Sequence, residues 1–131
     1  MRFAVAAALG SLALAAPGDR AAASFSGGTL TLTLHYWMTC GQPGVGPVRV
    51  GLPSGIRIGT LHATVNGKPA PVSHAAGTVS VTLPKPPQVT CMSITLGTLR
   101  VGLGGLHADS GTYALTAQVN RHSFRTSFRV G

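Results

Sequence analysis

Apolar and polar side chains alternate without interruption between Thr29 and Cys40. A period of two residues is typical of a half-buried β-strand, which packs one face against a core and turns the other towards solvent. We therefore predict a strand here, with an inner face that ends at a cysteine. The inner positions are Leu30, Leu32, Leu34, Tyr36, Met38 and Cys40, and the outer positions are Thr31, Thr33, His35, Trp37 and Thr39.

Shorter stretches of the same alternation follow along the chain. They lie at residues 48–52, 56–58, 61–65, 79–83, 99–103, 113–119 and 124–130. Gly and Pro residues separate them, and Asn66-Gly67 is a pair that favours a two-residue type I′ hairpin turn. No sustained period of 3.6 residues occurs after the first residues of the chain. The pattern predicts about seven or eight short strands in an antiparallel β-sandwich.

The composition agrees with strands joined by turns. The 131 residues suit one domain and include 18 Gly and 9 Pro but no glutamate. Ten Lys and Arg residues stand against two acidic residues, Asp19 and Asp109, and the formal net charge is +8. A surplus of this size attracts anionic partners, and it also helps to keep an exported domain in solution.

The first residues have the pattern of an export signal. Arg2 is followed by an apolar run at residues 3–16, which is too short for a membrane-spanning helix. Small residues at Ala21-Ala22-Ala23 favour cleavage after Ala23, and Ala13-Leu14-Ala15 offers an alternative after Ala15. We therefore expect a signal peptide at residues 1–23 and a mature domain at residues 24–131. This domain would be secreted to the extracellular space or the cell envelope, without stable membrane insertion.

Two cysteines in an exported chain of this size indicate a disulfide, and Cys40–Cys91 is the only intramolecular pairing. A bridge of this kind stabilises a small domain by restricting its unfolded chain. A zinc or copper site that includes the cysteines is the rival interpretation. It lacks the closely spaced ligand pairs that are typical of such sites.

The segment Asp109-Ser110-Gly111-Thr112-Tyr113 resembles the start of strand F in immunoglobulin-like domains. In that family the tyrosine hydroxyl donates a hydrogen bond back to the backbone at a corner between strands. The resemblance implies an immunoglobulin-like sandwich in which Asp109, Gly111 and Tyr113 form a structural corner. Leu115 stands where the family has its second cysteine. Val65-Asn66-Gly67 and the later Gly-Thr-Tyr strand also resemble β-sandwich modules of small exported bacterial proteins, of an actinobacterium-like kind.

Catalytic residues are scarce in the sequence. General acid–base chemistry usually needs carboxylates, and the domain at residues 24–131 has one, Asp109, which the corner already uses. There is no nucleophile-elbow, phosphate-loop or zinc-helix motif. We expect no enzymatic activity, no cofactor and no metal site; a small secreted metal carrier or hydrolase is the alternative.

Two groups of residues are candidates for binding. Four arginines lie late in the chain and could hold an anionic envelope polymer: Arg100, Arg121, Arg125 and Arg129. Trp37, with His35 beside it in the outer phase, could bind a sugar or a protein partner. Specific nucleic-acid binding is not expected, because no run of aromatic residues accompanies the arginines. The sequence predicts a non-catalytic binding or structural module, although the arginines could serve solubility alone.

Overall fold

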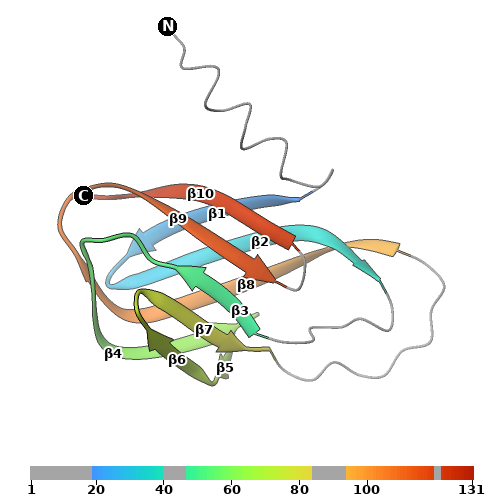
Figure 1. Cartoon of the computed structure of the whole chain (residues 1–131), viewed down its shortest axis with the longest axis horizontal. Helices are drawn as coiled ribbons and strands as arrows, with labels where there is room; N and C mark the ends of the chain where they lie inside the picture. Colours follow the sequence, from blue (N-terminus) through green and yellow to red (C-terminus); the bar gives the residue numbers. More distant parts are fainter. Residues whose placement is uncertain (1–18, 40–46, 84–93, 120–121) are drawn as a thin grey trace, which may run out of the picture.

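Two antiparallel five-stranded sheets pack face to face in this domain (Figure 1). The structure, a computed structural model, describes residues 19–39, 47–83, 94–119 and 122–131. The predicted all-β antiparallel sandwich is therefore confirmed. The described residues form ten strands rather than seven or eight, because one strand begins inside the predicted leader and two short strands form around Pro69 and Pro71.

The first sheet has the strand order β1-β2-β8-β4-β5. Its central pairing joins β2 to β8 from Leu30 opposite Leu103 to Thr39 opposite Ile94. The strands are β1 (Arg20–Ser26), β2 (Thr29–Thr39), β4 (Ile56–Val65), β5 (Lys68–Ala70) and β8 (Ile94–Ala108).

The second sheet has the strand order β10-β9-β3-β7-β6. Its centre is β3, which pairs with β9 on one side and with β7 on the other. The strands are β3 (Pro47–Gly51), β6 (Val72–Ala75), β7 (Thr78–Thr82), β9 (Gly111–Val119) and β10 (His122–Val130). Within the described ranges there is no helix of the length and apolarity needed to cross a membrane.

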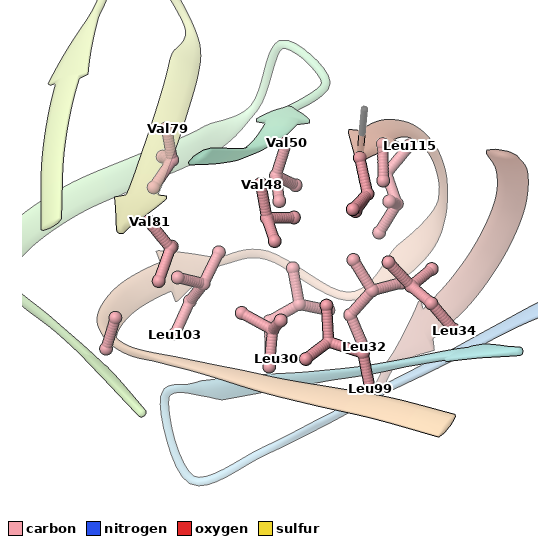
Figure 2. Packing of buried hydrophobic residues seen from close by; sticks show 14 of the residues in the cluster. Leu30, Leu32, Leu34, Val48, Val50, Val79, Val81, Leu99, Leu103 and Leu115 are labelled. Carbon is pink, nitrogen blue, oxygen red and sulfur yellow. The ribbon is translucent and has the colours of Figure 1, made fainter. Parts of the chain in front are cut away.

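The core lies between the sheets and consists of the inner rows of both. Leu30, Leu32 and Leu34 of β2 are fully buried, as the alternation predicts. Figure 2 shows these leucines facing side chains of the second sheet. The buried partners that the figure labels on that sheet are Val48, Val50, Val79, Val81 and Leu115.

The first strand belongs to the folded domain although it overlaps the predicted leader. All of β1 pairs with β2, from Arg20 opposite His35 to Ser26 opposite Thr29. Strand β1 also lies beside β10 of the other sheet (Figure 1), where the rings of Phe25 and Phe128 stack 6.1 Å apart. Cleavage after Ala23 would remove more than half of this strand.

The residue just before β1 is fixed to the other sheet by its side chain. The Asp19 carboxylate lies 2.9 Å from Nδ1 of His122, and only 3% of the Asp19 side chain is exposed. The His122 ring in turn packs 4.8 Å from Tyr36, where burial raises the pKa of the phenol. The described structure thus makes side-chain and strand contacts at residues 19–23, upstream of the cleavage predicted after Ala23.

Asn66 and Gly67 form the predicted hairpin turn between β4 and β5. Both residues have positive φ angles, 53° and 86°, and Val65 pairs with Lys68 across the turn. Asn66 also continues the sheet: its backbone N–H donates to the Arg100 carbonyl, and its side-chain oxygen accepts the Arg100 N–H at 3.0 Å.

Strand β4 contains a bulge opposite Gly105 of β8. The register shifts between Ile58 and His62, and the Thr60 carbonyl oxygen lies where a Cβ of residue 105 would stand. Gly105 also has a φ of +82°, which L side chains rarely adopt. The bulge therefore requires glycine at this position for two reasons.

We predict that a chain beginning at Asp19 folds as stably as a longer one, whereas a chain beginning at Ser24 is less stable. The shorter chain loses four residues of the β1–β2 ladder and the Asp19–His122 contact. At about 1 kcal/mol for each net hydrogen bond, the loss should exceed about 2 kcal/mol in urea unfolding. Equal urea midpoints for the two chains would contradict a role of residues 19–23 in the fold.

N-terminal sequencing of the mature protein should likewise find a start upstream of Asp19, as cleavage after Ala15 would give.

We also predict that Gly105→Ala destabilises the domain more than Gly67→Ala does. Both glycines have positive φ, +82° and +86°, but an added Cβ meets no atom within 4 Å at Gly67. Gly67→Ala should therefore cost only the backbone strain of about 1–2 kcal/mol. Gly105→Ala should cost clearly more because Thr60 must also move, and urea unfolding measures the difference. Equal losses would show that the bulge tolerates a side chain.

Candidate functional site

Within its described residues, the outer face of the second sheet carries three exposed arginines. Arg49 lies on β3, while Arg125 and Arg129 lie on β10, with β9 between the two strands. Their outward direction follows from the alternation, because the residues beside them in the sequence are inner residues of the core. Those buried neighbours are Val48, Val50, Phe124 and Phe128. We call Arg49, Arg125 and Arg129 the arginine face.

Strand β9 places a polar side chain beside each of these arginines. Gln118 is opposite Arg49, and on the other side of β9 Thr116 is opposite Arg125. Thr112 is opposite Arg129, and all three β9 side chains belong to exposed residues. Cross-strand neighbours of this kind lie close enough to act on the same ligand group.

Neither carboxylate of the sequence lies on this face. The chain has two acidic residues, and the structure describes both. Asp19 is held by His122, and Asp109 lies in the turn between β8 and β9 with its carboxylate 3.6 Å from the Arg57 guanidinium of the first sheet. The Arg57–Asp109 pair is exposed and so contributes little to stability. Among the described residues, the arginine face therefore consists of cationic and uncharged side chains.

The outer face of the first sheet displays a second set of polar residues. His35 of β2 is fixed there by a hydrogen bond between its Nδ1 and Thr98 Oγ1 of β8, 3.0 Å apart. Two exposed arginines, Arg20 of β1 and Arg100 of β8, flank β2 on either side. Trp37 is on β2, opposite Leu96 in the register, but its side chain lies outside the described part. Its exposure stays a prediction.

The four arginines expected to cluster do not all share one face. Arg125 and Arg129 do, but Arg100 lies on the outer face of the other sheet, opposite Thr33. Arg121 falls outside the described residues. The arginine that does lie near Arg125 is Arg49. The sequence shows that Arg49 points outward, because it lies between two inner valines. Its neighbours could not be predicted, because they depend on the pairing of β3 with β9.

The three residues expected at the corner lie together where β8 turns into β9. The Tyr113 hydroxyl donates a hydrogen bond to the Asp109 carbonyl oxygen at 2.8 Å. The Tyr113 ring stacks against Phe128, with the ring centroids 5.6 Å apart. Gly111, which lies between Asp109 and Tyr113 in the sequence, has a φ of +154°. The corner thus fixes the end of β10 that carries Arg129.

Both cysteines fall outside the described residues, so the Cys40–Cys91 disulfide stays a prediction. The nearest described residues are paired: Thr39, which precedes Cys40, is opposite Ile94, which follows Cys91 by three residues. Among the residues that the structure does describe, no group of three His, Cys, Asp or Glu side chains could hold a metal ion.

An open groove of about 360 Å³ lies at the edge of the second sheet, beside β6 and β7. Its lining consists of prolines, aliphatic side chains and hydroxyls, and it includes no side chain suited to acid–base chemistry. The lining residues are Pro47, Pro71, Val72, Ser73, Ser80, Thr82 and Leu83.

Comparison with known proteins identifies similar structures but no sequence family. No family model matches the chain, and no curated protein matches its sequence. A crystal structure of BslA, a bacterial hydrophobin, is similar with a TM-score of 0.57 at 19% identity, covering 86% of this chain and 98% of that one. The collagen-binding domain of a Staphylococcus aureus adhesin has a TM-score of 0.42 at 10% identity, covering 88% and 99%. At such low identity the first likeness shows the sandwich fold alone.

Proposed function

We propose that this domain is a secreted, non-catalytic binding or structural module of the cell envelope, and that its arginine face holds an anionic polymer. One observation carries the proposal. Arg49, Arg125 and Arg129 share one sheet face, while both acidic side chains of the chain are held elsewhere by His122 and Arg57.

The charge of the whole domain supports an anionic partner. With cleavage after Ala15, the alternative that keeps Asp19 and all of β1, Arg2 is lost from the ten basic residues; nine remain against two acidic ones, which gives +7. Such a surplus raises the local concentration of anions around the domain. A single exposed ion pair contributes at most about 1 kcal/mol, so useful affinity needs several contacts at once. A flat face with three arginines suits a polymer that offers many anionic groups.

The structural likeness and the leader support the proposed location. The similar protein BslA is a bacterial hydrophobin. The sequence pattern at residues 1–16 is typical of export. Because sandwich folds host many unrelated functions, the choice of ligand rests on the arginine face and not on the fold.

The first-sheet face around His35 and Trp37 is the second candidate, for a protein partner. The hydrogen bond that holds His35 on this face against Thr98 favours a defined surface there.

We expect Trp37→Ala to leave retention on anionic polymer unchanged. Loss of polymer retention in Trp37→Ala would move the polymer site to the first sheet.

Substitution of the arginine face should weaken retention on isolated envelope polymer. We expect Arg49→Gln/Arg125→Gln/Arg129→Gln to lower affinity at least about tenfold, since three exposed contacts of about 0.5–1 kcal/mol are lost. The matched control is Arg20→Gln/Arg57→Gln/Arg100→Gln, which removes the same charge from the first sheet. Co-sedimentation with purified envelope at physiological salt measures both variants.

Each variant should retain its fold, because all six arginines are exposed. Circular dichroism and urea unfolding check this. An equal loss in the two triple variants would mean that net charge alone drives retention, and the arginine face would then not be a site. Absence of retention by the unsubstituted protein would reject the proposed function as a whole.

A further inference from the structure

We infer that the arginine face takes an extended polyanion, which crosses β9 between Arg49 and Arg125 and then follows β10 to Arg129, rather than a single small anion. The inference rests on the proposed function and adds the form of the ligand. It follows from three features: the spacing of the arginines, the repetition of their polar neighbours, and the inward direction of the aromatic rings.

The sheet register sets the spacing. Arg49 and Arg125 lie on either side of β9, opposite Gln118 and Thr116, so their Cα atoms are about 12 Å apart. Arg129 lies four residues beyond Arg125 on the same strand, about 14 Å further on. The outer two arginines are therefore about 22 Å apart. Arg49 and Arg129 are too far apart for both side chains to meet at one phosphate or sulfate. A ligand that engages all three arginines therefore needs separated anionic groups.

The polar neighbours repeat along the same line. Each arginine has an exposed hydroxyl or amide opposite it on β9: Gln118 for Arg49, Thr116 for Arg125, and Thr112 for Arg129. Each pair combines a guanidinium, which matches a planar anionic group, with a side chain that can donate to an oxygen of the ligand backbone. Three similar subsites in a row fit a ligand built from similar units.

The aromatic side chains favour a glycan or polyol-phosphate polymer over a nucleic acid. Single-stranded nucleic acids bind proteins largely by stacking their bases on exposed aromatic rings. In the described part of the second sheet, the rings of Tyr113, Phe124 and Phe128 lie on the inner side and pack against one another or against the first sheet. The arginine face offers charge and hydrogen bonds without a stacking platform. We therefore assign it to an anionic polymer that needs no stacking.

Oligosaccharides of defined length test the inference directly. Two probe series supply different anionic groups: heparin fragments, which are sulfated, and oligogalacturonates, which are carboxylated. In both series the affinity per chain should rise steeply until the oligomer spans about 22 Å and should change little beyond that length. Inorganic phosphate or sulfate at matched ionic strength should not displace the longer oligomers. Titration calorimetry measures the affinities.

Single substitutions then locate the chain on the face. Arg129→Gln should shorten the length at which the affinity levels off to about 12 Å, the distance between the two remaining arginines. The slope of log K against log salt should fall by somewhat less than one, as expected when one ion contact is lost. Arg100→Gln, on the opposite sheet, is the matched control and should change neither the length dependence nor the salt slope.

Several results would overturn the inference. Disaccharides that bind as tightly as long oligomers, or competition by inorganic phosphate, would indicate a site for a small anion, and the proposed retention on envelope polymer could still hold. Tighter binding of single-stranded DNA of equal charge would indicate a nucleic-acid face. Tighter binding to phosphatidylglycerol vesicles than to both oligomer series would indicate a membrane surface. If the longest oligomers of both series fail to bind, the arginine face is not a polyanion site.

Discussion

The burial of every second residue is the constraint on which both the core and the arginine face depend. Phe124 and Phe128 fill the core from β10, so Arg125 and Arg129 must point away from it. A slip of one residue in the register would bury the arginines and expose the rings, at a large cost in free energy. The hydrophobic packing between the sheets, part of which Figure 2 shows, therefore sets which residues form the charged face.

The positions of the two acidic residues determine how charge is distributed over the surface. Asp19 is nearly buried against His122 and so ties the first strand to the last across the two sheets. Asp109 lies beside the tyrosine corner, near Arg57. Since the chain has no other acidic side chain, the outer face of the second sheet carries arginines and uncharged polar side chains in its described part. Binding to this face should be electrostatic and hence sensitive to salt.

The alanine-rich segment at the start shows how one sequence pattern can satisfy two different requirements. Ala21, Ala22 and Ala23 are small enough for a leader-peptidase site, and this favours a domain beginning at Ser24. In the structure the same residues form most of β1, and Ala21 and Ala23 pack against the core. Small side chains suit this position because β10 of the opposite sheet lies close to β1 (Figure 1). Such a contact between chain ends cannot be read from local composition.

The sequence by itself determined most of the strands, their inner and outer faces, the Asn66-Gly67 turn and the sandwich class, because alternation and turn preferences are local properties. It did not predict β1, β5 and β6. The order of the strands was decided only by the tertiary structure, since pairing joins segments distant in the chain and depends on how both sheets pack. That is why Arg49, 76 residues before Arg125 in the chain, lies beside it across β9. It is also why Arg100, much nearer in the sequence, lies on the opposite sheet. The candidate face is thus a product of strand order, which no local pattern encodes.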